Sequence, residues 1–185
     1  MFDVSTLLVL IPALPLAAAV LTAALGARWL GPRAHWPTVC AIGLSLVASL
    51  ALVAQVAWES SVERPGEIGY ERTVTLWHWA SVETAPDAAA DSSAGASAVQ
   101  PRNFTIDVTL RADPLTAIML ATVTLVSLLV AIYSIGYMHD DRGYWRFFSY
   151  ISLFVFSMTM LVSVSNFVLL YVFWEAVGLC SYLLI

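Results

Sequence analysis

Five long apolar runs, separated by polar connections, dominate the sequence of this 185-residue chain. They cover residues 7–26, 38–58, 115–138 and 147–164, and a fifth begins at Phe167 and continues to residue 185. A helix that crosses the hydrocarbon core of a bilayer needs about 20 mostly apolar residues. The pattern therefore predicts an all-α polytopic membrane protein with five transmembrane helices.

The connection at residues 59–113 is long and polar and has a different periodicity. Apolar and polar residues alternate from Phe104 to Arg111, and the run TVTLWHWA, which starts at Thr73, has a strand-forming composition. Alternation with a period of two is typical of a half-exposed strand. Residues 84–99, between these two runs, are small, polar and turn-rich. We therefore predict a β-hairpin with a flexible tip, lying at the membrane surface.

This loop divides the chain into three parts. Residues 1–58 hold the first two helices, residues 59–113 form the loop, and residues 114–185 hold the last three helices. Asp113 and Pro114 mark the start of the third helix, because Asp is a good N-cap and Pro fits the first helical position. Aromatic residues around the third polar connection predict an interfacial belt: Tyr133, Tyr137, Tyr144, Trp145, Phe147 and Phe148.

Composition narrows the possible classes of function. Hydrophobic residues make up 60% of the chain, charged residues make up 11%, and the mean hydropathy is +0.82. Too little charge is present to cover a water-facing surface, which excludes a soluble enzyme, a disordered chain and a nucleic-acid-binding protein. Cys40 and Cys180 lie inside apolar runs and the three histidines lie outside them. We therefore predict no metal site and no cofactor site in this chain, and the lipid bilayer as its surroundings.

The arginines of the short connections predict the orientation in the membrane. Arg28 and Arg33 lie in the first connection, and Arg142 and Arg146 lie in the third. Positive charge in short loops stays on the cytoplasmic side, and successive helices alternate in direction. The N-terminus and the loop at residues 59–113 are therefore expected on the non-cytoplasmic side.

Glu175 is the single acidic residue of thirteen that lies within an apolar run and away from its ends. It follows Phe167 by about 12 Å of helix, which places it near the middle of a hydrocarbon core about 30 Å thick. An ionised carboxylate there costs several kcal/mol unless it is paired, hydrated or protonated. None of the five runs contains Lys or Arg, so a positive partner has to come from another segment.

Two roles for Glu175 stay open at this point. In a structural role, its carboxyl would hydrogen-bond a Ser or Thr of a neighbouring helix. In a functional role it would carry a proton, because desolvation favours the protonated carboxyl and a basic neighbour favours the ionised one. Ionisable residues inside a membrane are functional by default, so the proton-transfer role is favoured. The Ser and Thr residues of the run at 147–164 are expected to bond their own helix backbone or to aid helix packing.

The sequence from about Arg111 to residue 185 resembles a known family. The stretches DPLTAIMLATVTLVSLLVAIYSIGYM, from Asp113, and RFFSYISLFVFSMTMLVSVSNFVLLYVFWEAVGLCSYLLI, from Arg146, are similar to the large antiporter-like subunit of respiratory complex I. This subunit is called subunit L or chain 5 of NADH-quinone oxidoreductase. The most specific part is WEAVGLCSYLLI, which starts at Trp174 and combines a mid-membrane acid with a fixed order of neighbours. The first two helices and the loop are similar in layout only.

The resemblance implies a membrane-arm subunit in the inner (plasma) membrane that takes part in proton translocation coupled to electron transfer from NADH to quinone. By the same resemblance, Glu175 corresponds to an essential glutamate that pairs with a lysine on a later, broken helix. Other membrane-arm subunits would be the partners. The family subunit holds no redox centre, and NADH, FMN, iron–sulfur clusters and quinone belong to the whole complex. Because the family has many more spans, we expect this chain to be an N-terminal fragment, inactive by itself.

Two alternative functions stay open beside this one. The large subunit of multisubunit cation/proton antiporters shares the region around Glu175, and a relative in membrane-bound hydrogenases or in bicarbonate uptake is a variant of the same function. The chain could instead be a non-catalytic membrane scaffold in which Glu175 is structural. Sodium efflux without NADH oxidation would favour the antiporter, and full function of a Glu175→Ala variant would favour the scaffold.

Overall fold

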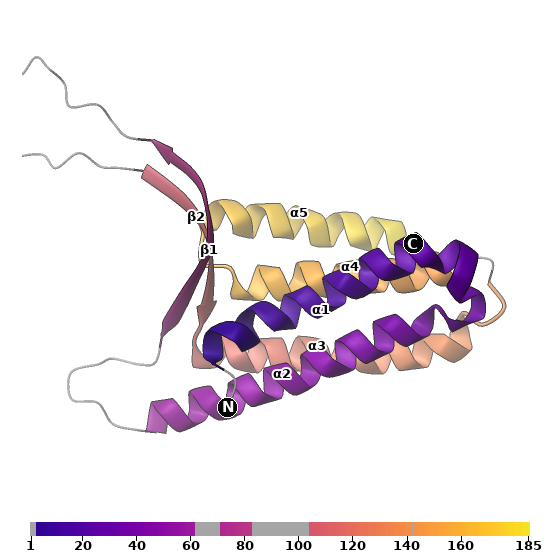
Figure 1. Cartoon of the computed structure of the whole chain (residues 1–185), viewed down its shortest axis with the longest axis horizontal. Helices are drawn as coiled ribbons and strands as arrows, with labels where there is room; N and C mark the ends of the chain where they lie inside the picture. The colour runs from indigo at the N-terminus through magenta and orange to yellow at the C-terminus, as the bar shows by residue number, and fades with distance from the viewer. Residues whose placement is uncertain (1–2, 62–70, 83–103, 142) are drawn as a thin grey trace, which may run out of the picture.

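Five helices account for most of the computed structural model, which describes residues 3–61, 71–82, 104–141 and 143–185 (Figure 1). All five are long and apolar enough to cross a membrane, which confirms the predicted helices to within a few residues at each end. They are α1 (Val4–Leu25), α2 (His35–Ser61), α3 (Pro114–Tyr137), α4 (Tyr144–Ser163) and α5 (Phe167–Leu184). A π-helical turn, Gly26–Leu30, and a 3-10 turn, Gly31–Arg33, join α1 to α2.

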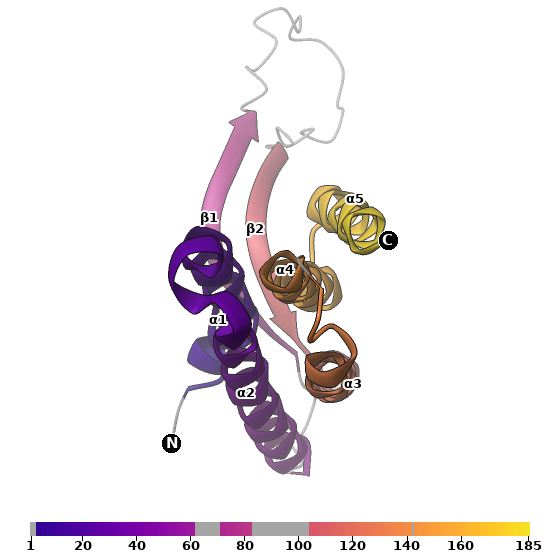
Figure 2. The ribbon, with the colours of Figure 1, turned by 90° about the vertical axis from the view of Figure 1, so that its right-hand side faces the viewer.

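The helices run alternately up and down, and α5 lies at the edge of the bundle (Figures 1 and 2). Helices α1 and α3 each pack against both α2 and α4. Helix α5 packs mainly against α4. Buried hydroxyl groups link these helices. Ser49 Oγ lies 2.9 Å from Thr124 Oγ1, and Ser149 Oγ donates to the Ala19 carbonyl at 3.1 Å. Small polar residues allow helices in a membrane to approach closely, which explains these crossings.

Helix α1 continues through two buried prolines, Pro12 and Pro15. Proline has no N–H, so Pro15 cannot donate to the carbonyl of Ile11, four residues earlier. The Ser45 hydroxyl of α2 donates to this Ile11 carbonyl at 2.8 Å, and both residues are fully buried. A neighbouring helix therefore supplies the hydrogen bond that the proline removes, as apolar surroundings require.

The predicted β-hairpin is confirmed as an antiparallel pair of strands, β1 (Arg72–Val82) and β2 (Phe104–Ala112). Arg72 pairs with Ala112 at one end of the ladder and Val82 pairs with Phe104 at the other. The register shifts twice, because β1 has one extra residue between Thr75 and Trp77 and another between His78 and Ala80. The predicted tip at residues 84–99 lies outside the described residues.

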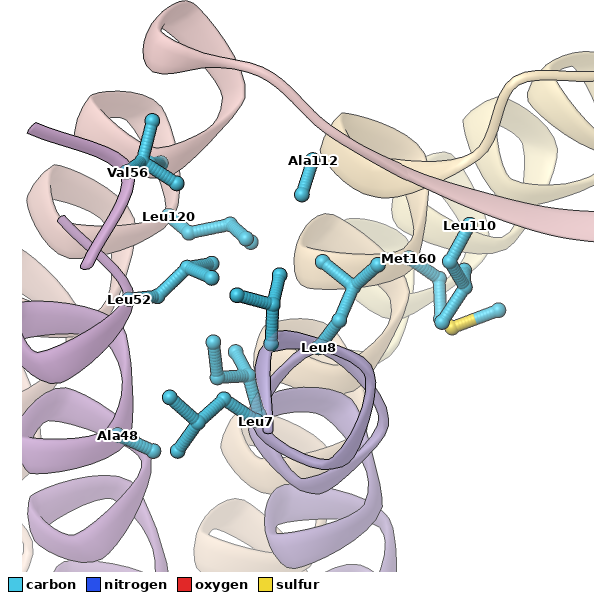
Figure 3. Packing of buried hydrophobic residues seen from close by; sticks show 12 residues of the cluster. Leu7, Leu8, Ala48, Leu52, Val56, Leu110, Ala112, Leu120 and Met160 are labelled. Carbon is cyan, nitrogen blue, oxygen red and sulfur yellow. The ribbon is translucent and has the colours of Figure 1, made fainter. Parts of the chain in front are cut away.

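The hairpin lies across the end of the helix bundle that also holds the start of α1 and the start of α5 (Figure 1). Leu110 and Ala112 of β2 are fully buried there, in a cluster with apolar residues from four of the helices (Figure 3). Among them are Leu8 of α1, Leu52 of α2, Leu120 of α3 and Met160 of α4. The strand therefore closes the apolar core at this end of the bundle.

The predicted interfacial belt is wrong for two of its six aromatic residues. Tyr144 and Phe148 are buried in a cluster with Ala34, and the Tyr144 hydroxyl lies 2.9 Å from His35 Nδ1. The first turns of α4 face the connection between α1 and α2, so these rings pack inside the protein and not against lipid headgroups. Tyr133 and Tyr137, in contrast, are exposed and stack on each other with ring centroids 6.1 Å apart.

Candidate functional site

Glu175 is the ninth of the 18 residues of α5, so it lies at the middle of the helix. Its side chain is exposed. Within the described part of the chain, its carboxylate forms no hydrogen bond and no ion pair. The structure thus places Glu175 halfway along α5 and leaves its carboxylate uncovered.

The surroundings of Glu175 follow from how α5 packs on α4. Leu169 and Cys180 are the two buried residues of α5, and the Phe173 ring meets Phe156 of α4 edge-on, with centroids 5.9 Å apart. With 3.6 residues per turn, Glu175 lies on the opposite side of the helix from these contacts. Its neighbour Gly178 has no other atom within 4 Å of the place where a Cβ would lie. This face of α5 is therefore open to a further helix, to water or to lipid.

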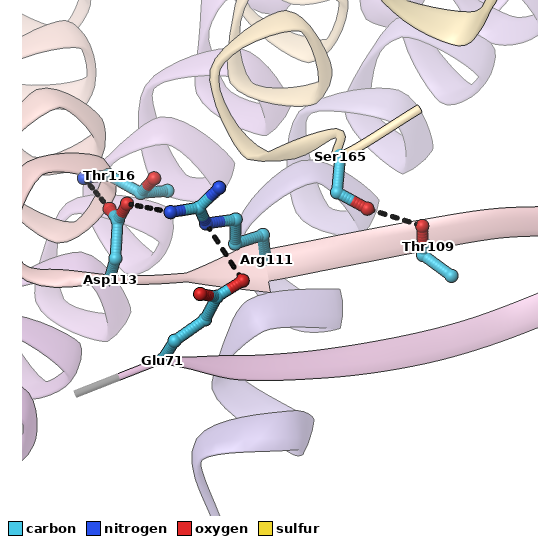
Figure 4. Close-up of polar contacts among 6 residues, drawn as sticks. All are labelled: Glu71, Thr109, Arg111, Asp113, Thr116 and Ser165. Atoms are coloured by element: carbon cyan, nitrogen blue, oxygen red, sulfur yellow. Dashed lines mark hydrogen bonds and ion pairs between the residues drawn. The ribbon is translucent and has the colours of Figure 1, made fainter. Parts of the chain in front are cut away.

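The hairpin holds the turn that precedes α5. The Ser165 N–H donates to the Thr109 carbonyl at 3.1 Å, and the hydroxyls of the same two residues form a short hydrogen bond (Figure 4). Asn166 Nδ2 donates to the Asp107 carbonyl at 3.4 Å, while Asn166 Oδ1 accepts the Val168 N–H at 2.9 Å as the N-cap of α5. The start of the helix that carries Glu175 is therefore bonded directly to β2.

The start of α3 is organised by Asp113 and Arg111 (Figure 4). Asp113 Oδ1 accepts the Thr116 N–H at 2.6 Å, which confirms the predicted N-cap. Arg111 bridges Asp113, at 3.2 Å, and Glu71, the residue before β1 at the same end of the hairpin, at 3.3 Å. Partial burial raises the pKa of Asp113, but the hydrogen bonds from Thr116 and the charge of Arg111 outweigh it and hold the pKa below its ordinary value.

The hydroxyls of α4 are occupied by structural bonds, as predicted. Ser157 donates to the Leu153 carbonyl and Ser163 to the Thr159 carbonyl, both within α4. Ser152 donates to Thr38 of α2 at 2.9 Å. These bonds satisfy buried polar groups and join helices, which is the packing role.

The other titratable side chains that the structure describes form pairs and no larger cluster of metal ligands. His78 Nδ1 lies 2.7 Å from Asp107 Oδ1 across the hairpin, with the His78 side chain mostly exposed. Over residues 3–61, 71–82, 104–141 and 143–185, no group of three or more His, Cys, Asp or Glu side chains could hold a metal ion. His78 therefore takes part in a cross-strand pair.

Comparison with known proteins bears on what this arrangement does. Residues 99–148 match the family described as "NADH-Ubiquinone oxidoreductase (complex I), chain 5 N-terminus". NADH-quinone oxidoreductase subunit L of Neisseria meningitidis serogroup B is 65% identical over 74 residues, which is 40% of this chain and 11% of that protein. The predicted relationship to subunit L/chain 5 of complex I is confirmed.

Further members of the subunit L/chain 5 family are similar at the same level. Subunit L of Rickettsia typhi is 53% identical over 87 residues, or 47% of this chain and 13% of the relative. The chloroplastic NAD(P)H-quinone oxidoreductase subunit 5 of Mesostigma viride is 57% identical over 83 residues, or 45% of this chain and 13% of the relative. The matched region spans 11 to 13% of the length of these relatives.

Sequence reasoning missed the residues that tie the hairpin to α5. Asn166 directly precedes an apolar run, which is an N-cap signal that could have been recognised. The bond of Asn166 to Asp107, and the bonds between Thr109 and Ser165, had no local signal. They depend on how the strand lies across the bundle, and only the tertiary structure provides that.

Proposed function

We propose that this chain is the N-terminal part of a membrane-arm subunit of NADH-quinone oxidoreductase, and that Glu175 transfers protons in it. The observation that supports the proposal most strongly is the mid-helix position of Glu175, with its carboxylate uncovered, in a chain related to subunit L/chain 5. Structural carboxylates are normally hydrogen-bonded, whereas a carboxylate that has to change its protonation state needs access to a donor and an acceptor.

The charge balance of the site supports a partner outside these helices. Helices α1 to α5 contain no Lys, and their one arginine, Arg146, lies in the first turn of α4. An ionised carboxylate in hydrocarbon is stable only with a positive partner or water. The open face of α5 is the side from which the lysine implied by the family resemblance would approach.

The location and partners belong to the same proposal. The subunit lies in the inner (plasma) membrane, with the N-terminus and the hairpin on the non-cytoplasmic side, and contacts the other membrane-arm subunits. Redox energy comes from NADH, FMN, iron–sulfur clusters and quinone elsewhere in the complex. The related proteins are named as quinone oxidoreductase subunits, which favours this function over a cation/proton antiporter or a scaffold.

The test is Glu175→Gln in the full-length subunit within the assembled complex. Gln has nearly the same shape but cannot exchange a proton, so we expect proton pumping per NADH oxidised to fall about tenfold or more. Pumping is measured in inside-out vesicles, and NADH oxidation is measured in parallel. Asp140→Asn is the matched control, because it neutralises an exposed loop acid and should leave pumping unchanged.

Wild-type pumping by the assembled Glu175→Gln complex would remove the role of this residue. Sodium efflux without NADH oxidation in reconstituted vesicles would instead assign the subunit to a cation/proton antiporter. Loss of assembly on deletion of the hairpin, together with normal pumping by the Glu175 variant, would assign it to a scaffold.

A further inference from the structure

Helix α5 is held by few contacts. Only Leu169 and Cys180 of its residues are buried, and α4 is the helix against which α5 packs. Near the end of α5, the one polar contact to α4 is a weak one, with Ser157 Oγ 4.0 Å from Cys180 Sγ. By packing alone, α5 is the least restrained of the five helices.

Strand β2 provides a second attachment at the other end of α5. Leu110 forms an isolated antiparallel bridge with Val164, the residue that ends α4. Thr109 bonds Ser165 through both backbone and side chain, and the Asp107 carbonyl accepts Asn166 Nδ2. Every residue from Val164 to Asn166 is therefore bonded to the strand.

The strand is itself anchored firmly in the bundle. Leu110 and Ala112 are fully buried among residues of α1 to α4. Arg111, between them, is ion-paired to Glu71 and Asp113 (Figure 4). The bonds from this strand to the turn before α5 therefore join a helix with few buried residues to a strand that is buried in the bundle.

We propose that β2 sets the depth and the rotation of Glu175, with Thr109, Ser165 and Asn166 as positioning residues. The inference rests on the proposed proton-transfer role of Glu175. An α-helix is rigid over a few turns and rises about 1.5 Å per residue. The position of the N-cap residue Asn166 therefore determines where Glu175 lies, about 13 Å further along the helix. Proton transfer requires donor and acceptor to be within hydrogen-bond reach, so a small displacement interrupts it.

The test removes the side-chain tethers and keeps the helix cap. In the full-length subunit within the complex, Thr109→Val keeps the branched shape without the hydroxyl, and Asn166→Ser keeps an N-cap acceptor without the amide donor. For the double variant, which lacks both side-chain bonds, we expect proton pumping per NADH oxidised to fall about thirty-fold, the population change that corresponds to two lost hydrogen bonds. The infrared band of the Glu175 carboxyl, assigned with Glu175→Gln, is expected to shift.

Two controls separate tethering from general damage. Thr109→Ser as a single variant keeps the hydroxyl, so it is expected to leave both the pumping and the infrared band as in the wild type. Thr122→Val removes an exposed hydroxyl that bonds only the Ile118 carbonyl of its own helix, and it should change neither.

The outcomes distinguish this inference from the function on which it rests. Normal pumping by Glu175→Gln would contradict the proposed function itself. The positioning role alone would be overturned if Glu175→Gln impairs pumping but the double variant does not. In that case the double variant would pump the wild-type number of protons per NADH oxidised, and its Glu175 infrared band would not shift. If the double variant does not assemble, Thr109→Val alone is measured in the same way, and the same two results decide.

Discussion

At the scale of single residues, Glu175 and Asp113 show how solvent decides what a carboxylate does. Asp113 lies at a helix start, where the hydrogen bond from the Thr116 N–H and the charge of Arg111 favour its ionised form. Glu175 has none of these partners in the described structure and lies halfway along an apolar helix. The same functional group is therefore a cap in one place and a candidate proton carrier in the other.

The cap at Asp113 leads to a pH-dependent prediction. Because the pKa of Asp113 is lowered in the folded protein, its contribution to stability is present at neutral pH and is lost as the pH falls through the folded pKa. We expect Asp113→Ala to lower the free energy of unfolding by about 1 kcal/mol at pH 7. Unfolding by denaturing detergent in mixed micelles measures this difference.

Asp113→Asn is the matched variant, because it keeps a capping oxygen and removes the charge. Its deficit should be smaller than that of Asp113→Ala at pH 7 and should vanish in acid, when the wild-type carboxyl is also uncharged. A deficit of Asp113→Asn that stays constant from neutral pH to strong acid would contradict the electrostatic part of the argument.

At the scale of elements, helix α1 depends on its neighbour α2. Its two prolines would interrupt an isolated helix, yet α1 is continuous over its 22 residues. Pro15 leaves the Ile11 carbonyl without a donor from its own helix, and the Ser45 hydroxyl donates the hydrogen bond instead. In a water-poor interior, an unsatisfied carbonyl is costly, so the second helix stabilises the backbone of the first.

This dependence is tested with Ser45→Ala. We expect the variant to lower the free energy of unfolding in mixed micelles by about 1 kcal/mol, because the buried Ile11 carbonyl loses its donor. In a Pro15→Ala background the helix regains its own N–H, so adding Ser45→Ala should then cost much less. Ser60→Ala, at an exposed hydroxyl near the end of α2, is the control with little expected effect. Equal costs of Ser45→Ala in both backgrounds would mean that the serine does not compensate for the proline.

At the scale of the whole molecule, the two ends of the bundle differ in character. One end is closed by the hairpin, while the other carries the connection with Arg28 and Arg33 and the start of α4, which has Arg146 in its first turn (Figure 1). The helix count places both arginine-bearing connections at the same end. The positive charge of these connections predicts a cytoplasmic location for their end, and the hairpin on the non-cytoplasmic side stays a prediction.

Cysteine labelling tests this orientation directly. Cys40 and Cys180 are first replaced, and single cysteines are introduced at Trp77, an exposed residue of β1, and at Asp140, in the connection between α3 and α4. A membrane-impermeant maleimide should label Trp77→Cys from the non-cytoplasmic side and Asp140→Cys from the cytoplasmic side. The reverse pattern would invert the predicted topology, and labelling of both from one side would contradict the five-helix arrangement.

Local chemistry is sufficient to predict much of this protein from its sequence. Apolar length determines five helices, alternation determines the strand around Leu110, and Asp113 with Pro114 determines where α3 begins. Glu175 is recognisable for the same reason, because a charged residue in an apolar run stands out without any knowledge of its neighbours. These features depend on the solvent and the backbone, which act on each segment separately.

Only the tertiary structure decides how the segments meet. The two extra residues in β1, near Thr75 and His78, break its alternation, so the residues that face the bundle could not be derived from the pattern. Burial of Tyr144 and Phe148, and compensation of Pro15 by Ser45, depend on which helix lies alongside. The bonds from Thr109 to the turn before α5 join segments 56 residues apart, and no local periodicity encodes such a contact. The sequence by itself therefore identified Glu175, and the packing of strand against turn determined how the helix that carries it begins.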